Sequence, residues 1–379
     1  MHSAELLDRL ISFPTVSRDS NLALIEFVRE WLAQCGVACK LYLDTGGQKA
    51  NLFASIGPTE TAGVLLSGHT DVVPIDGQRW SSAPFQMKQR GEQLYARGTA
   101  DMKGFLACAL RAAQLASQRP LRLPLQLAFS YDEEVGCLGV RSLIEDMASW
   151  SHRPRFCIVG EPTLLRPAVG HKGKIAVKVT CRGRAAHSST PDRGINAIHL
   201  AGDLIARIRE RQGDIAWSGG RDPGYDVPYT TLHVGVIQGG TVLNIVPEHC
   251  VFEFEIRHLP SDDTRAMIEA IRGDAADIVK MTSAADAAIE FETLHEFPAL
   301  ETASDAEVVE LAAQLTGHRE RIKVGFGTEG GLFSGRLGIP SVVCGPGAIE
   351  QAHKPDEFVS TDQLQRCDAM LSALLERLC

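Results

Sequence analysis

The chain has 379 residues, of which 44% are hydrophobic and 22% charged; this composition is typical of globular proteins, and the length favours two domains. The formal net charge of -9 offers no basic stripe that could neutralise phosphates, which argues against a nucleic-acid partner. No apolar segment approaches the roughly 18 residues that span a bilayer, so no membrane partner is expected. Residues 1–14 also lack the basic and apolar regions of a secretion signal.

The ten cysteines are scattered along the chain, and most lie in apolar runs, as Cys157 and Cys344 do. Thiols in such surroundings behave as small buried hydrophobic groups and are typical of a reducing compartment. Only Cys35 and Cys39 lie close together, and they have no partners that would complete a zinc site. We therefore expect a cytoplasmic protein.

The first predicted element is an amphipathic helix over about 20–35, where apolar residues such as Leu24, Val28 and Leu32 recur at helical spacing. Four short apolar runs follow at 64–67, 125–130, 156–160 and 341–345. Such runs fit strands that are buried on both faces of a sheet, with helices such as 103–117 and 361–378 beside them. These elements predict an α/β fold with a mixed, mostly parallel sheet flanked by helices.

The pattern changes between about 174 and 290, where polar and apolar residues partly alternate as in half-exposed antiparallel strands. The alternating segments are 174–183, 231–240 and 250–259, and the helical ones are 195–212 and 262–280. We interpret residues 174–290 as a smaller α+β domain inserted into the larger one. The larger domain would then consist of residues 1–173 and 291–379.

Residues that can bind metals follow the predicted buried strands. The clusters are His69 with Asp71, Asp132 to Glu134, and Glu161, with Asp101 in a turn before a helix and His353 shortly after the last strand. In open α/β sheets, ligands collect beyond the carboxyl ends of the strands, so these segments are expected to converge on one crevice. Imidazole nitrogen and carboxylate oxygen suit Zn²⁺, Co²⁺ or Mn²⁺.

Each cluster alone has an ordinary structural explanation, because a lone histidine is more often hydrogen-bonded than a ligand and an acidic triplet is usually a solvated loop. Together they predict a site for two metal ions. Two histidines and three carboxylates cannot fill two closed tetrahedral sites unless one carboxylate bridges. This shortage of ligands leaves room for a shared water between ions roughly 3.5–4 Å apart. Clustered acids are also costly to bury without cations or protons.

These segments also resemble a known family, the dimetal M20 metallopeptidases and deacylases. The resemblance covers nearly the whole chain, and its motifs are GHTDVVP (68–74), GTADMKG (98–104), DEE (132–134), GEPT (160–163) and AHKPDE (352–357). It implies a zinc-peptidase-like catalytic domain with an inserted lid and dimerisation domain. It also implies that His69, Asp101 and Glu161 hold one ion while Asp101, Glu134 and His353 hold the other, with Asp101 bridging.

The same resemblance implies roles for residues that are not ligands. Glu133 would be the general base that accepts a proton from water, and Asp71 would orient His69. His187 resembles the lid histidine that stabilises the oxyanion, often from a partner subunit, although a lone histidine here would usually be a surface residue. The family thus implies a homodimer formed through the inserted domain.

Three further residues match substrate-binding positions of the family. Asn244 lies in a turn over 239–247, and Thr328 lies in a substrate-lining loop over 327–331. Arg257 stands where relatives hold a substrate carboxylate, a task that suits a bidentate guanidinium, although a structural salt bridge is the alternative.

Within the family, the runs SYDEEVGCLGVRSL and GPGAIEQAHKPDEF most resemble the acetylornithine deacetylase group. This implies a small acylated amino acid as substrate, with N²-acetyl-L-ornithine giving L-ornithine and acetate in arginine biosynthesis, and Zn²⁺ before Co²⁺ or Mn²⁺ as the metal. The alternatives within the family are a succinyl-diaminopimelate desuccinylase, an acetylcitrulline deacetylase, an aminoacylase and a dipeptidase. Outside enzyme function, a metal- or amino-acid-binding protein and a metal-free homodimer scaffold are the remaining alternatives.

Overall fold

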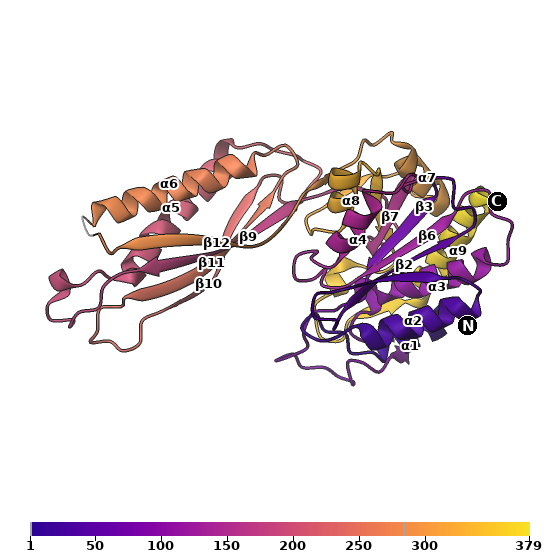
Figure 1. Cartoon of the computed structure of the whole chain (residues 1–379), viewed down its shortest axis with the longest axis horizontal. Helices are drawn as coiled ribbons and strands as arrows, with labels where there is room; N and C mark the ends of the chain where they lie inside the picture. The colour runs from indigo at the N-terminus through magenta and orange to yellow at the C-terminus, as the bar shows by residue number, and fades with distance from the viewer. Residues whose placement is uncertain (1, 283–284) are drawn as a thin grey trace. The chain divides into compact units, whose positions relative to one another are not determined.

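The computed structural model describes residues 2–282 and 285–379. By its internal contacts the chain divides into unit 1, Met1–His171 with Leu300–Cys379, and unit 2, Lys172–Ala299 (Figure 1). Each unit has its own hydrophobic core. Within the described ranges, no helix has both the length and the low polarity that crossing a bilayer requires.

Unit 1 is built on a mixed sheet of nine strands among the described residues, in the order β1-β2-β6-β3-β7-β15-β8-β13, with β14 paired to β8. The strands are β1 Cys39–Leu43, β2 Ala50–Ile56, β3 Val64–His69, β6 Leu125–Ser130, β7 Phe156–Pro162, β8 Ala168–His171, β13 Leu300–Glu301, β14 Ile322–Val324 and β15 Ser341–Gly345. The central strands β6, β3, β7 and β15 run parallel, and antiparallel strands complete the edges. The predicted α/β class with a mixed sheet is confirmed.

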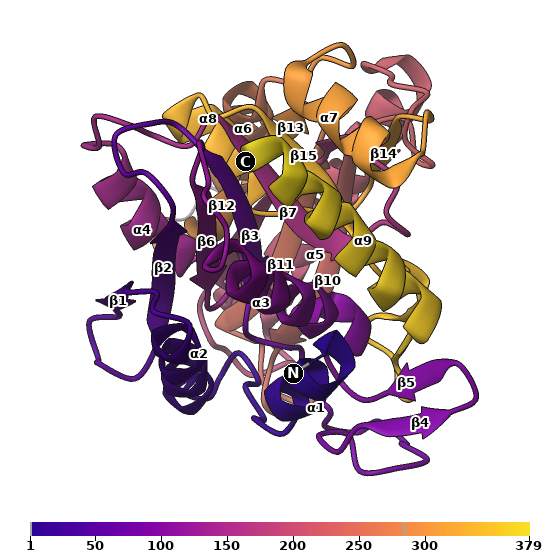
Figure 2. The ribbon, with the colours of Figure 1, turned by 90° about the vertical axis from the view of Figure 1, so that its right-hand side faces the viewer.

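Helices cover both faces of this sheet (Figure 2). The helices of unit 1 are α1 Ser3–Ile11, α2 Leu22–Gln34, α3 Gly104–Ala116, α4 Val140–Met147, α7 Glu307–Thr316, α8 Gly330–Leu337 and α9 Thr361–Leu378. Helix α3 contacts β3, β6 and β7 and packs against α1, α2 and α9, whereas α4 and α8 contact each other. A small separate sheet consists of β4 Lys88–Arg90, β5 Gln93–Tyr95 and β16 Phe358–Ser360.

The four short apolar runs are the strands β3, β6, β7 and β15, as predicted, and every residue of each strand is buried. Such strands need no alternation of polar and apolar residues because helices cover both of their faces. Their carboxyl ends lie at the same edge of the sheet, since the four strands are parallel neighbours. This edge positions the candidate site.

Unit 2 is a four-stranded antiparallel sheet with two long helices, again counting the described residues. Its elements are β9 Gly173–Arg182, η2 Pro191–Arg193, α5 Ala197–Ser218, β10 Thr231–Gly239, β11 His249–His258, α6 Thr264–Met281 and β12 Ala288–Phe297. The boundary expected at 290 was wrong, because it falls inside β12. That strand pairs with β9 along most of its length, so unit 2 continues to Ala299.

Candidate metal centre

Strand β3 ends at His69, whose buried imidazole lies at the carboxyl edge of the sheet. Its Nδ1 is 2.9 Å from the backbone oxygen of Asp71. Because a carbonyl oxygen can only accept, Nδ1 carries the proton, and in the neutral ring the lone pair of Nε2 is free. That lone pair faces the carboxylate of Asp101, whose Oδ1 is 3.0 Å away, so a cation or a proton is needed between the two.

Asp101 lies between the two histidines of the site. It belongs to the short segment η1 (Thr99–Lys103), in which its own φ of -122° and ψ of 96° are not helical. The segment follows Gly98, whose φ of +86° favours glycine. Its Oδ2 is 3.1 Å from Nε2 of His353, while its Oδ1 faces His69. Burial opposes its ionisation, but the imidazoles of His353 and His69 hold the pKa of Asp101 well below its usual range. The two oxygens of one carboxylate thus face two different imidazoles.

Three glutamates complete the cluster. Glu161 lies within β7, and its Oε1 is 3.5 Å from Nε2 of His69. Glu134 follows β6, and its Oε2 is 3.1 Å from Nε2 of His353, while Oε2 of Glu133 is 4.0 Å from Nε2 of His69. Burial, together with the neighbouring charge of Asp101, raises the pKa of Glu134 and of Glu161 to about 7 each. Burial also raises the pKa of Glu133 well above its usual value.

The close approach of β7 to helix α3 fixes the position of Glu161. A Cβ atom on Gly160 would lie 1.9 Å from Cγ of Phe105, so only glycine lets the ring of α3 pack against the strand here. The carboxylate that follows is therefore attached to a rigid part of the core. This explains why glycine precedes Glu161 in the GEPT run.

The donor set fits two divalent cations. Two groups of three side chains each bring their possible ligand atoms within 4.8 Å of one another. One group is His69, Glu133 and Glu161, and the other is His69, Asp101 and Glu134. Within the described residues, Oε1 of Glu134 is buried without a hydrogen-bond partner. Buried carboxylates that repel one another and lack donors are stabilised when cations compensate them. Because Glu133 belongs to one of these groups, proximity alone does not separate a base from a ligand.

The carboxylate of Asp71, which was predicted to orient His69, is bonded mainly to other groups. It accepts hydrogen bonds from the hydroxyl of Ser17 (2.7 Å) and from the backbone N–H groups of Glu133 (3.1 Å) and Glu134 (3.3 Å). Its Oδ1 is 3.6 Å from Nδ1 of His69, which lies closer to the Asp71 carbonyl. Asp71 thus holds the acidic loop. Ser17 was not predicted, because a single serine in a loop gives no signal in the sequence.

Thr328 is placed differently from the expectation for a substrate-binding residue. It has 0% exposed surface, and its hydroxyl accepts a hydrogen bond of 3.0 Å from the backbone N–H of Gly330 at the start of α8. The neighbouring Glu329 is also buried, and its carboxylate accepts from the hydroxyl of Ser67 on β3. In this structure Thr328 bonds to the first turn of α8 and Glu329 links that turn to β3, and the two residues have almost no surface for a substrate.

The other predicted residues, His187, Asn244 and Arg257, lie in unit 2. His187 pairs with Ile245 in an isolated bridge, and the backbone oxygen of Asn244 accepts from Ser188, so the two loops adjoin. Arg257 donates from Nε to Glu255 at 2.8 Å and keeps part of its guanidinium exposed.

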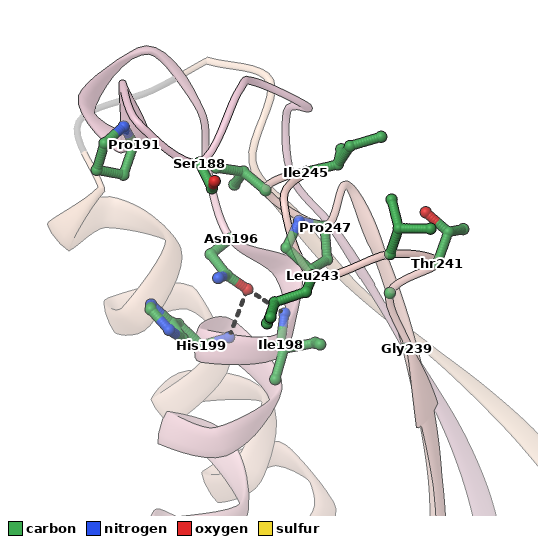
Figure 3. A pocket seen from close by; sticks show the side chains of 13 residues that line it. Ser188, Pro191, Asn196, Ile198, His199, Gly239, Thr241, Leu243, Ile245 and Pro247 are labelled. Carbon is green, nitrogen blue, oxygen red and sulfur yellow. Dashed lines mark hydrogen bonds between the residues drawn. The ribbon is translucent and has the colours of Figure 1, made fainter.

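These loops border a pocket at the amino-terminal end of α5 (Figure 3). Asn196 caps that helix by accepting from the N–H groups of Ile198 and His199. The turn over 239–247 forms another wall and exposes all of Leu243. Unit 2 therefore presents an apolar turn beside His187.

The sequence is similar to characterised proteins over nearly its full length. The profile of peptidase family M20/M25/M40 matches residues 65–377. An acetylornithine deacetylase from Myxococcus xanthus is 36% identical over 98% of this chain and 96% of its own length. An acetylornithine deacetylase from Pasteurella multocida is 34% identical over an alignment that covers 99% of this chain and 97% of that protein's length.

Solved structures share the fold. An M20 family metallo-carboxypeptidase from Sulfolobus solfataricus superposes with a TM-score of 0.78 at 20% identity, covering 99% of both chains. A dinuclear metal-binding M20 peptidase from Bacillus subtilis has a TM-score of 0.68 at 18% identity and covers 99% of this chain and 97% of its own. The profile match and the long alignments at more than 30% identity establish the relationship, and the chain belongs to the M20/M25/M40 peptidase family of hydrolases.

Proposed function

We propose that the chain removes the acetyl group from N²-acetyl-L-ornithine, giving L-ornithine and acetate in arginine biosynthesis, with two divalent metal ions and Zn²⁺ as the first choice. The observation that carries this proposal is the convergence of His69, Asp101, Glu134, Glu161 and His353 at one edge of the sheet. The acetylornithine deacetylases that align with the whole chain support the choice of substrate. Free cysteines throughout the chain support a cytoplasmic location.

In the proposed mechanism His69, Asp101 and Glu161 would hold one ion, and Asp101, Glu134 and His353 would hold the other. When bound, the ions polarise the amide carbonyl and make the attacking water more acidic. Glu133, placed beside His69, accepts a proton from that water and delivers it to the leaving amine nitrogen. Asp71 keeps Glu133 and Glu134 in position through their backbone N–H groups.

Unit 2 is proposed to act as the lid and to supply groups that bind the substrate. Nδ1 of His187 accepts the backbone N–H of Ser189 at 3.1 Å and lies 2.7 Å from the Ser189 hydroxyl, which can also donate. Because the N–H can only donate, a neutral ring carries its proton on Nε2. This tautomer is the one needed to donate to the oxyanion of a tetrahedral intermediate. Arg257 and Asn244 are proposed to bind the α-carboxylate of the substrate, because both side chains keep exposed donor groups.

A substrate panel tests the proposed reaction. The values of kcat/KM for acetylornithine, acetylcitrulline, succinyl-diaminopimelate and simple dipeptides should be compared on protein of measured metal content. We expect acetylornithine to be among the best substrates. A preference for another amide would overturn acetylornithine as the substrate but leave the assignment as an amide hydrolase intact. A metal-loaded protein without any amidase activity would instead favour a binding protein.

We further propose that the chain forms a homodimer through unit 2. Strand β10 is an outer strand of its sheet, and Val236 and Ile237 on it are about half exposed. An exposed apolar edge strand is a ready site for pairing with a second chain. The substitution Ile237→Lys is expected to shift a dimer to the 41.1-kDa monomer in sedimentation velocity. The matched control is Leu41→Lys on the outer strand β1, which should leave the dimer intact.

The same variant tests how His187 acts. If His187 serves the active site of the partner subunit, the Ile237→Lys monomer will lose activity together with self-association. A fully active monomer would contradict action across the dimer. A wild-type chain that is itself monomeric would contradict the homodimer.

A further inference from the structure

A fully buried ion pair joins the two segments that carry Asp101 and His353. Arg97 and Glu357 have side chains that are each 1% exposed, and Nη1 of Arg97 donates to Oε2 of Glu357 at 2.7 Å. A buried ion pair adds little to folding stability compared with an apolar pair, because the free energy of removing both charges from water is about as large as their mutual attraction. Net stability is therefore a poor explanation for this pair, and its remaining contacts indicate another role.

The second oxygen of Glu357 holds the backbone at Asp101. Its Oε1 accepts hydrogen bonds from the N–H groups of Ala100 (2.9 Å) and Asp101 (3.1 Å). The backbone oxygen of Glu357 also accepts from the N–H of Ala96. Glu357 thus fixes the chain on both sides of Arg97, directly at the carboxylate that lies between the two histidines.

Arg97 extends the same connection to His353. Its Nη1 lies 3.3 Å from the backbone oxygen of Lys354, and its Nη2 donates to Oε1 of Gln78 at 2.6 Å. Gln78 in turn donates from Nε2 to the backbone oxygen of His353 at 3.0 Å. Trp80 also donates to Oε1 of Gln78, so two donors fix which end of the amide faces Arg97.

His353 needs such support more than the other ligand residues do. Its φ is +62°, a left-handed conformation that is uncommon for a residue with a side chain, and its side chain is 52% exposed. Asp101 and His353 are brought together from distant parts of the sequence, and their side chains meet at 3.1 Å. Metal ligands must be held within a fraction of an ångström, and partners outside the ligand shell commonly provide this.

We propose that Arg97, Glu357 and Gln78 form a clamp that positions Asp101 and His353. Gln78 would set the affinity of the second metal position, defined by Asp101, Glu134 and His353, whereas the Arg97–Glu357 pair would act on both positions through Asp101. All three act as positioning residues, since none of them is assigned a contact with the substrate. This proposal rests on the proposed two-metal function. The clamp consists of a charged pair that fixes the Asp101 backbone and an amide that fixes the His353 backbone.

The substitution Gln78→Leu tests the clamp with little risk to the fold, because it leaves the Arg97–Glu357 pair in place. Metal-free protein is titrated with Zn²⁺ in a calorimeter, and Co²⁺ absorption spectra report the ligand geometry. We expect one of two binding events to weaken about 10- to 100-fold and the other to stay unchanged. The metal-free protein should remain cooperatively folded, with a melting temperature lowered only by the unpaired Nη2 of Arg97. The matched control is Gln89→Leu, which removes an exposed amide bonded only locally, to Gly91, in the β4–β5 hairpin.

Glu357→Gln tests the charged half of the clamp. Asp101 contributes to both metal positions, so this variant should weaken both binding events and alter the Co²⁺ spectrum. If it fails to fold, the double variant Arg97→Met/Glu357→Leu replaces the ion pair by an apolar pair of similar volume, and it should fold yet bind the metal as weakly.

Two results can be told apart. A wild-type protein that binds no Zn²⁺ would overturn the two-metal function and the clamp together. A wild type with two binding events, and folded variants with the same two affinities and spectra, would overturn the clamp alone.

Discussion

Replacing Glu133 by glutamine is expected to lower kcat by about 10²- to 10⁴-fold, the range over which a positioned general base commonly contributes. Glutamine has nearly the shape of glutamate but cannot accept a proton at neutral pH. The carboxylate lies 4.0 Å from Nε2 of His69, beside the proposed metal site. Its replacement is therefore expected to slow the transfer of a proton from the attacking water. Steady-state kinetics with acetylornithine, run beside elemental analysis of the same sample, measure both consequences.

The metal content of this variant decides the role of Glu133, which the structure also places within reach of His69 and Glu161. A base that is not a ligand predicts low activity with both ions retained. Loss of one ion would make Glu133 a ligand, and unchanged turnover would remove it from the mechanism. The exposed Glu60, changed to glutamine, is the matched control and should affect neither quantity.

Asp101→Ala is expected to have the largest effect on metal binding. The two oxygens of Asp101 lie 3.0 Å from Nε2 of His69 and 3.1 Å from Nε2 of His353, so one substitution removes a ligand from both positions. We expect both binding events to weaken by more than about 100-fold, since even partners outside the ligand shell contribute up to that amount. Activity should fall below detection at micromolar Zn²⁺.

Metal titration of the folded Asp101→Ala variant, followed by calorimetry, provides the measurement. Circular dichroism would confirm that the variant is folded, and Asp305→Ala removes an exposed carboxylate as a control. A variant that still binds two ions with wild-type affinity would exclude Asp101 as the bridging ligand.

The sequence predicted those parts of the fold in which the local pattern of apolar and polar residues indicates how deeply the segment is buried. Strands β3, β6, β7 and β15 are buried along their whole length, and such runs are apolar without interruption. Strand β12 was divided by the boundary at 290, because it is largely exposed and a register shift between Thr293 and His295 interrupts its alternation. An exposed strand of this kind is recognisable mainly by its partner β9, which a local pattern does not reveal.

In the site, too, residues that stand in local motifs were predicted, whereas residues that act through long-range contacts were not. His69, Asp101, Glu134, Glu161 and His353 were predicted because each stands in a short motif close to a strand end or a turn, and the structure brings their side chains together. Ser17 and Gln78 support the site through hydrogen bonds to residues far away in the sequence, Ser17 to Asp71 and Gln78 to His353. An isolated serine or glutamine in a loop carries no signal, so only the folded structure identifies them.

Side chains from five separate segments are proposed to surround two divalent ions. Diffraction from crystals grown with Zn²⁺, with data collected on both sides of the zinc absorption edge, tests it most directly. Two anomalous peaks should appear, one contacting His69, Asp101 and Glu161 and the other contacting Asp101, Glu134 and His353. An anomalous map without zinc at these side chains, from protein that hydrolyses acetylornithine, would contradict the claim.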